Sequence, residues 1–309
     1  MTMIDELVPQ PENTGTRDAI RRTAHAHRAR RVAISRVMMI LCGIALVLTS
    51  IPLVLLLIQL IVRGSSQLNA TFFTKLPQSP SLVDPNAIGG VLNSIIGTLA
   101  LTIYASIMAI PVGVLTGVYL AESRSKLAAT LRVIAQTMAG APSILMGLFG
   151  FTLIVKYLQI GFTAIAGSFA LAVLMLPVIA ISTEISVRNV PDTLREAGLA
   201  LGAKPHKVSL KVVIPSALSG IVTGCLLAVA RAIGETAPVL LTIGGGYLNE
   251  WRPLNPVSAL PLSIYMNAKS EWPSQRAQVW GIALVLVAFV FVLSLTARIW
   301  ASRKQKRNS

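Results

Sequence analysis

The chain has 309 residues, of which 54% are hydrophobic and only 13% are charged, and its mean hydropathy is +0.70. A soluble domain of this length carries roughly a quarter charged residues, whereas the apolar residues here form blocks long enough to cross a bilayer, which needs about 20 residues each. The composition excludes an ordinary soluble domain and predicts an all-α polytopic membrane protein, since the short alternating strands of a membrane barrel do not occur.

The net charge of +15 does not indicate a nucleic-acid partner. Lys and Arg gather at the cytoplasmic ends of membrane spans, and this alone accounts for the excess. Cys42 and Cys225 both fall in apolar segments, so we expect free thiols and no disulfide. The sequence has no metal-ligand spacing, and we predict no metal site, no bound cofactor and no catalytic residue in this chain.

Residues 1–36 are predicted to form a disordered, basic cytoplasmic tail. Residues 1–16 are polar and contain two prolines, and residues 17–36 contain seven arginines. An amphipathic helix lying on the membrane is the alternative for the arginine-rich part. The apolar run that follows is much longer than the core of a signal peptide, so no cleavage is expected.

Six transmembrane helices are predicted in the rest of the chain. The first, 37–62, stands apart from a core domain of five that occupies residues 93–300. Residues 301–309 form a second basic tail. Several spans contain proline, which membrane helices tolerate where neighbours satisfy the freed carbonyls, so a kinked bundle is expected. The expected spans are 37–62, 93–120, 127–155 with an interruption at 140–142, 162–185, 216–243 and 279–300.

The distribution of Lys and Arg predicts the orientation. With both termini in the cytoplasm, 20 of the 27 cationic residues fall on the cytoplasmic side, six fall outside, and Arg231 lies within a span. This is the positive-inside pattern of membrane proteins. It places the polar segment 186–215, called the coupling loop below, in the cytoplasm. The loops 63–92 and 244–278 then lie outside, with a short helix expected over 257–268.

The coupling loop has the pattern of a short helix over residues 191–201. Proline is favoured in a first turn, and a glycine after the last apolar residue supplies a left-handed cap. Small residues within the apolar stripe would let a partner approach closely. An amphipathic helix on the membrane surface is the alternative. The residues in question are Pro191 in the first turn, the stripe Leu194, Ala197, Gly198 and Leu201, the cap Gly202, and Pro215, where the chain returns to the membrane.

Glu196-Ala197 is followed by Gly202 and, after nine intervening residues, by Val212-Val213-Ile214-Pro215. This spacing resembles the EAA loop of ABC importer permeases, in which the loop forms a helix that seats in a groove of the ATPase subunit. Arg-Ala-Ile-Gly-Glu-Thr-Ala-Pro at 231–238 and Ala-Pro-Ser-Ile at 141–144 narrow the resemblance to PstA-type permeases of phosphate importers. The similarity covers about residues 93–298.

This resemblance implies a type I ABC importer permease fold with coupling through residues 191–215. The implied partners are a homologous permease subunit, giving a heterodimer, a cytoplasmic ATPase dimer that uses ATP and Mg, and an extracytoplasmic phosphate-binding protein. Members often carry an arginine where this chain has Ile181, so no anion contact is transferred to that position.

Arg231 and Glu235 are the charged residues expected inside the membrane. They are four apart, so a continuous helix would place them on one face, about 15 residues into the span and near mid-depth. A guanidinium matches phosphate oxygens, and Glu235 would neutralise it when the path is empty. The alternative is an ion pair that only holds the bundle together. Glu184 and Arg188, near the cytoplasmic end of the fourth span, are further candidates. Glu184 is expected either to cap a helix or to pair with Arg188.

No G-x-x-x-x-G-K-[ST] motif occurs, so ATP hydrolysis is expected in a separate chain. The sequence thus predicts the membrane subunit of a phosphate importer in the cytoplasmic membrane. A permease for another oxyanion, or the sister subunit of the same importer, is the alternative. A self-sufficient channel and an enzyme acting on lipid phosphates fit less well, since the latter would need a cluster of His, Asp or Ser at a span end.

Overall fold

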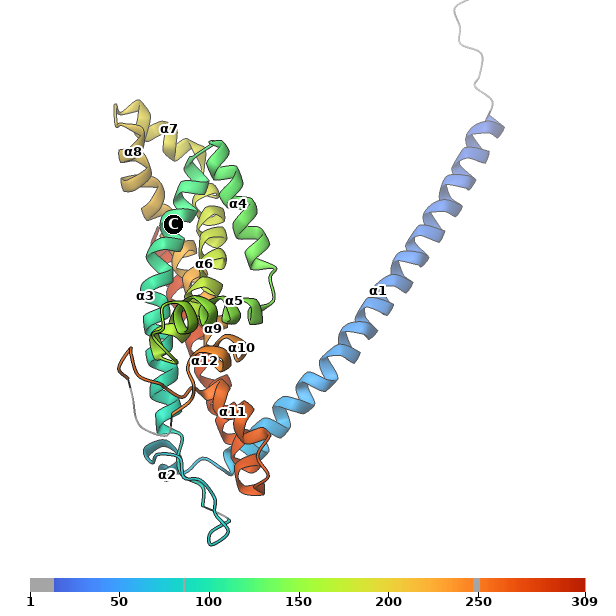
Figure 1. Cartoon of the computed structure of the whole chain (residues 1–309). Coiled ribbons are helices and arrows are strands. Elements are labelled where there is room, and N and C mark those ends of the chain that lie inside the picture. Colours follow the sequence, from blue (N-terminus) through green and yellow to red (C-terminus); the bar gives the residue numbers. More distant parts are fainter. Residues whose placement is uncertain (1–13, 86, 247–250, 309) are drawn as a thin grey trace, which may run out of the picture. The chain divides into compact units, whose positions relative to one another are not determined.

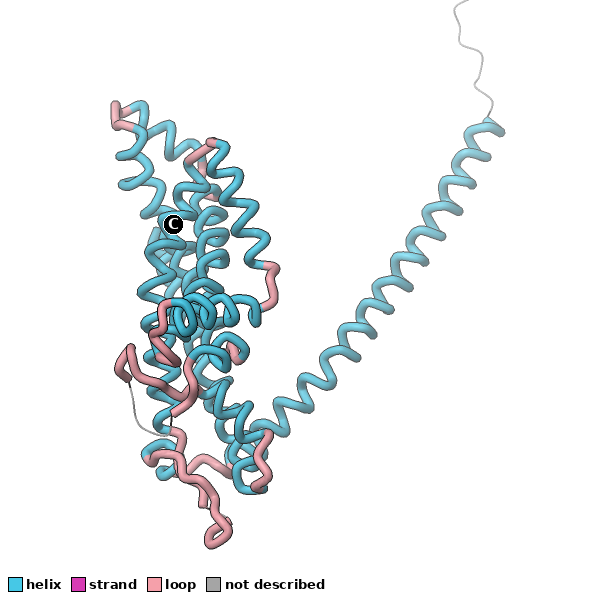
Figure 2. The backbone as a smooth tube through the Cα atoms, in the orientation of Figure 1, coloured by secondary structure: helices cyan, strands magenta, loops and turns pink. Residues whose placement is uncertain are grey.

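The computed structural model of the protein describes residues 14–85, 87–246 and 251–308. These residues are mainly helical, and their only β interaction is an isolated bridge between Gly244 and Val257 (Figures 1 and 2). The chain divides into two compact units, Met1–Gln59 and Leu60–Ser309. Each unit is described by itself.

The first unit consists of helix α1, which runs over Thr14–Ser65 and continues into the second unit. The predicted disordered tail is therefore wrong for residues 14–36, whereas residues 1–13 lie outside the described part. The physical reason is composition: between residues 17 and 36 the chain is rich in Ala and Arg, which favour helix, and has no Gly or Pro to end it. Most side chains between 34 and 59 are exposed and apolar.

The centre of the second unit is formed by α3 (Leu92–Glu122), α6 (Ala164–Arg188) and α9 (Ile214–Ile233), with α12 (Pro273–Asn308) packed on α9. Small residues bring α3 and α6 together. A Cβ at Gly117 would lie 2.5 Å from the carbonyl oxygen of Ala180. Both helices continue through their prolines. The core therefore follows from close backbone approach and apolar burial, and the predicted spans 93–120 and 162–185 are confirmed.

Two of the predicted spans are broken. The third consists of α4 (Lys126–Ala139), α5 (Ser143–Gly150) and the π-helix η1 (Phe151–Tyr157), and its two halves meet at an angle of 105°. Gly140 ends α4 and Pro142 precedes α5, as the interruption at 140–142 predicted. Such an angle is far larger than a proline kink within a continuous helix.

The fifth span is the second broken one. It begins with α8 (Pro205–Val208) and the π-helix η2 (Ser209–Val213), continues as α9, and resumes after a gap as α10 (Ala237–Thr242). The prediction of one span over 216–243 is wrong at residues 234–236, because α9 ends at Ile233. The π-helical turn lies just before Pro215, whose ring and missing N–H disfavour regular α-helix there.

Five described helices are long and apolar enough to cross a membrane, and the bent pair of the third span makes a sixth if it counts as one. Within the second unit, α7 (Asp192–Ala200) and α8 lie at one end, and α2 (Ala70–Thr74) and α11 (Leu260–Ala268) lie at the opposite end (Figure 1). Helices α5 and α10 lie between these ends. The short helix expected over 257–268 is confirmed as α11.

Candidate functional site

The turn that ends α7 in the coupling loop folds as the sequence predicts. Pro191 directly precedes α7, and the helix ends at Ala200. Gly202 has φ of +75°, and its N–H donates to the carbonyl of Leu199, while the N–H of Ala203 donates to that of Gly198. These two bonds form a Schellman motif, which requires a residue in the left-handed region. The predicted cap is confirmed, and it sets the direction in which the chain leaves α7.

The residues of the predicted apolar stripe lie in two different environments. Leu194 is 42% exposed and Leu201 is 88% exposed, and Glu196 and Ala197 are also exposed. Gly198 instead faces α8: a Cβ there would lie 3.1 Å from the side chain of buried Val208. The close approach that this glycine permits is therefore within the coupling loop rather than with a partner. What remains uncovered is an apolar surface around Leu194 and Leu201.

Glu184 lies in a cluster of charges at the same end of the second unit. Its side chain is only 8% exposed, and its Oε1 accepts hydrogen bonds from Arg132 Nε at 2.7 Å and lies 2.9 Å from Arg188 Nη2. Both arginines also donate to the carbonyl of Leu120 near the end of α3. The predicted pairing of Glu184 with Arg188 is confirmed. The pairing of Arg132 with Glu184 could not be predicted from the sequence, because no sequence spacing relates a residue of α4 to one of α6.

Arg231 and Glu235 lie at the break between α9 and α10. Their side chains approach to 3.6 Å between Arg231 Nε and Glu235 Oε1. The prediction that they share a helix face is wrong, because the helix ends between them; the pair forms across the end of α9. The Arg231 side chain is 47% exposed and that of Glu235 only 17%. The guanidinium is therefore the more available of the two to groups outside this chain.

The same break packs against the other broken span. Gly147 of α5 faces the first residues of α10, and its Cβ position lies 2.7 Å from Pro238 Cα and 3.2 Å from the Ala237 carbonyl oxygen. Helices α5 and α10 thus support each other in the middle of the second unit (Figure 1). Irregular backbone at membrane depth is tolerated where it is buried in protein or lines a polar path. This arrangement places Arg231 beside backbone that has left regular helix.

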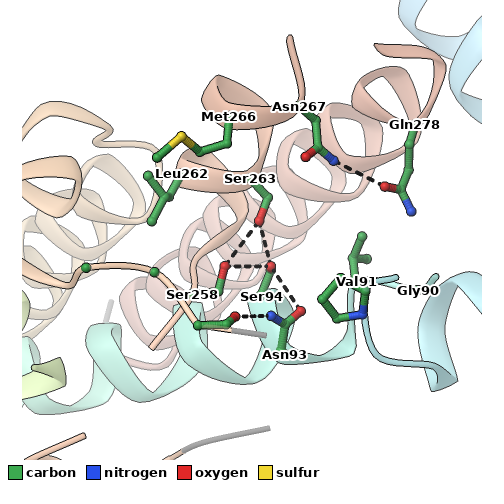
Figure 3. A pocket seen from close by; sticks show the side chains of 14 residues that line it. Gly90, Val91, Asn93, Ser94, Ser258, Leu262, Ser263, Met266, Asn267 and Gln278 are labelled. Atoms are coloured by element: carbon green, nitrogen blue, oxygen red, sulfur yellow. Dashed lines mark hydrogen bonds between the residues drawn. The ribbon is translucent and has the colours of Figure 1, made fainter. Parts of the chain in front are cut away.

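A polar pocket of about 270 Å³ lies at the end opposite the coupling loop (Figure 3). The hydroxyls of Ser94, Ser258 and Ser263 bond one another at 2.7–3.2 Å, and Asn93 Nδ2 donates to the carbonyl of Gly246. These residues join the start of α3 to the loops around α11. Because the groups largely satisfy one another, the pocket stiffens this end and offers neutral hydrogen-bonding groups to a small polar solute.

No group of three His, Cys, Asp or Glu side chains able to hold a metal occurs among the described residues. The candidate site therefore has two parts: the coupling loop with its charge cluster at one end, and the Arg231–Glu235 pair at the break. Neither part resembles a hydrolytic centre. Together they present an exposed apolar surface around Leu194 and Leu201 and a cation at a helix break.

The fold is similar to that of a solved subunit of the methionine ABC transporter MetNI in an inward-facing form. The TM-score is 0.57 at 21% identity, and the match covers 69% of this chain and 95% of that chain. The helix order and the two broken spans are therefore those of an ABC importer permease fold. With five helices long and apolar enough to cross a membrane, or six with the bent pair, the chain is a multi-pass membrane protein.

The chain belongs to the family of binding-protein-dependent transport system inner membrane components, whose family model matches residues 109–307. Its relatives include the phosphate transport system permease protein PstA of Haemophilus influenzae, 36% identical over 81% of this chain and 87% of that protein. PstA 1 of Mycobacterium tuberculosis is 38% identical over 71% of this chain and 72% of that protein. The predicted resemblance to PstA-type permeases is confirmed.

Proposed function

We propose that this chain is the membrane subunit of an ATP-driven importer of inorganic phosphate. The support is the agreement between relatives named as phosphate transport permeases and an arginine at a helix break in the apolar body of the protein. An intramembrane cation is costly, by at least roughly 2.5–3.5 kcal/mol on insertion scales, and such residues usually mark an ion or substrate path. Arg231 is the residue on which this proposal depends.

In the proposed cycle, Arg231 receives phosphate through its planar guanidinium, which matches two phosphate oxygens. Glu235 neutralises the guanidinium when no anion is present and limits how tightly the anion is held. A transporter needs binding that is weak enough for release, so a paired arginine suits passage better than an unpaired one. The half-exposed side chain of Arg231 and the largely covered side chain of Glu235 are consistent with these roles.

The proposed assembly contains a homologous permease subunit, two cytoplasmic ATPase subunits that use ATP and Mg, and an extracytoplasmic phosphate-binding protein. The ATPase would contact the exposed surface around Leu194, Glu196 and Leu201. Closure of the ATPase dimer on ATP would move the coupling loop, and α8, η2 and α9 lead from that loop without a break to Arg231. This continuity supports a direct mechanical connection between nucleotide binding and the anion path.

The test is uptake of radiolabelled inorganic phosphate by the complete complex in proteoliposomes loaded with ATP. We expect uptake by the wild type, loss of at least tenfold in Arg231→Ala, and partial retention in Arg231→Lys, which keeps the charge but not the planar fork. Arg124→Ala is the matched control, because this exposed arginine lies outside the break. Normal uptake by an assembled Arg231→Ala complex would overturn the role of this residue.

The anion itself is tested by competition. Excess unlabelled phosphate should suppress uptake, while molybdate and sulfate at equal concentration should not. Suppression by molybdate or sulfate alone would favour a permease for another oxyanion. Co-purification distinguishes an importer subunit from a self-sufficient channel. The importer subunit should retain an ATPase, whereas the channel should not.

A further inference from the structure

Glu122, the last residue of α3, makes hydrogen bonds to both limbs of the coupling loop. The limbs are α7, on the outgoing side, and η2, on the side that returns to α9. The Oε1 of Glu122 accepts a hydrogen bond from Arg195 Nη1 of α7 at 2.6 Å, and its Oε2 accepts one from Ser209 Oγ of η2 at 2.7 Å. One carboxylate therefore joins the outgoing helix and the returning turn of a loop that is otherwise exposed. Charge-assisted hydrogen bonds of this length are among the stronger polar contacts in proteins.

Arg195 also connects the loop to a second membrane helix. Its Nη2 donates to the carbonyl of Val187 near the end of α6, at 3.2 Å. Arg195 is one of the two partly covered residues of α7, whereas most of that helix is exposed. Its side chain is 24% exposed and that of Glu122 is 28% exposed. The pair is thus partly shielded from water on the side of α7 that faces the membrane helices.

The two helices reached by these contacts, α3 and α6, are packed closely against each other. Gly113 and Gly117 of α3 approach α6 so closely that added Cβ atoms would fall 2.7 Å from Ile179 and 2.5 Å from Ala180 and Thr183. Close-packed helices of this kind transmit displacement rather than absorb it. A force applied to α7 therefore has a short path to α6 through Arg195 and a short path to α3 through Glu122.

We infer that Glu122 is a positioning residue that latches the coupling loop to α3, so that movement of α7 is transmitted to the α3–α6 pair as well as along α9. This inference rests on the proposed function, since it assigns a route for the coupling that an importer needs. Without the latch, α7 remains attached to α6 through the chain and to α9 through η2, but its displacement reaches α3 only indirectly.

Asp192 is a second carboxylate near Arg195, but unlike Glu122 it does not connect the coupling loop to α3. Asp192 also lies near Arg195, at 3.8 Å from its Nε, but its side chain is 89% exposed and it belongs to the same helix. Its contact with Arg195 is therefore within α7, and it makes no bond to α3. Replacing Asp192 with Asn removes a carboxylate beside the same arginine and leaves both limbs attached, which makes it the matched comparison for Glu122→Gln.

The experiment measures phosphate transported per ATP hydrolysed by the full complex in proteoliposomes. For a partly exposed ion pair we expect Glu122→Gln to lower this ratio about threefold to tenfold. Asp192→Asn should lower it by less than about twofold. Arg195→Glu should behave like Glu122→Gln or worse, because it removes both the ion pair with Glu122 and the donor to the carbonyl of Val187.

Hydrogen exchange of residues 192–213 provides a readout that does not depend on the substrate. These amides should exchange faster in Glu122→Gln than in Asp192→Asn, because a limb released from α3 opens more often. Ser209→Ala removes the hydrogen bond from η2 to Glu122 and keeps the ion pair between Glu122 and Arg195. It should speed exchange mainly in residues 205–213. This variant therefore tests the latch even where the Glu122→Gln complex fails to assemble.

An unchanged transport ratio in Glu122→Gln would overturn the latch. Equal exchange rates in Glu122→Gln and Asp192→Asn would also overturn it. These outcomes are separate from failure of the proposed function, in which the wild-type complex itself does not take up inorganic phosphate while the exchange experiment still reports on the latch.

Discussion

The first turn of α10 meets Gly147 of α5 so closely that a Cβ at Gly147 would lie 2.7 Å from Pro238 Cα. The nearest atom, Pro238 Cα, is main chain and cannot move aside as the end of a flexible side chain can. The contact therefore holds the two broken spans in one arrangement. Since α10 begins just after Glu235, Gly147 helps to determine where the Arg231–Glu235 pair lies.

Gly147→Ala should therefore destabilise the protein and reduce transport. Forcing a methyl group into this contact is expected to cost about 1–3 kcal/mol, as overpacking of a core usually does. The measurements are thermal unfolding of the complex in detergent and phosphate uptake. Gly140→Ala is the control, because its Cβ would meet no atom closer than 3.7 Å. Equal unfolding temperatures for the two variants would contradict the proposed role of the contact.

Gly202→Ala tests the turn that ends α7. With φ of +75°, an alanine here is strained by about 1 kcal/mol, although nothing lies within 4 Å of the added Cβ. The strain should shift the exposed side chain of Leu201 and lower the phosphate transported per ATP about twofold to fivefold.

Gly161→Ala is the matched control for that change, because Gly161 has φ of +83° and an equally open Cβ position but lies outside the coupling loop. Both variants should lose similar unfolding free energy, and only Gly202→Ala should lose coupling. A similar loss of coupling in both would mean that general destabilisation, and not the turn, is responsible.

The sequence was sufficient to predict the features whose cause is local. The apolar blocks predicted the spans, since length and hydropathy decide membrane insertion. Glycine after the stripe predicted the cap at Gly202, because the left-handed region excludes most other residues. The spacing around Glu196 was enough to identify the family, and the comparisons confirmed it.

Features that depend on tertiary contacts were not predictable. The helix containing Arg231 ends before Glu235, and apolar periodicity alone does not show this break because both sides of it are apolar. The partner of Gly198 is Val208, ten residues away, and the pairs Arg132–Glu184 and Arg195–Glu122 join residues 52 and 73 apart. No helical or strand spacing relates such residues. The helical state of 14–36 follows from the helix propensity of its Ala and Arg residues, which the polarity of the segment does not reveal.

Glu184→Gln should lower stability more than the loss of an exposed carboxylate. The glutamine keeps the shape but leaves Arg132 and Arg188 without a counter-charge in a largely covered position. Removing one partner of a fully buried pair costs roughly 3–5 kcal/mol, and because the two arginines are 27% and 51% exposed we expect about 1–3 kcal/mol here.

Thermal unfolding of the complex measures this loss. Asp192→Asn is the comparison, since its exposed carboxylate makes only a long contact at 3.8 Å and should matter by less than about 0.5 kcal/mol. A Glu184→Gln complex as stable as Asp192→Asn would show that the cluster around Glu184 does not support the C-terminal end of α3.

Glu235→Gln should make phosphate bind more tightly and leave more slowly. Glu235 lies 3.6 Å from Arg231 and competes with the anion for the guanidinium. Removing its charge should lower the KM for phosphate about threefold to tenfold, as expected for loss of a partly exposed opposing charge. The maximal uptake rate should fall at the same time, because release becomes harder. Uptake kinetics over a range of phosphate concentrations measure both quantities.

Glu235→Asp is the control for this prediction because it shortens the side chain but keeps the negative charge. It should leave the KM closer to the wild-type value than Glu235→Gln does. If both variants raise the KM equally, Glu235 would act by positioning Arg231 rather than by neutralising it. In that case the ion pair would be a structural brace at the helix break, and the moderating role assigned to its charge would be wrong.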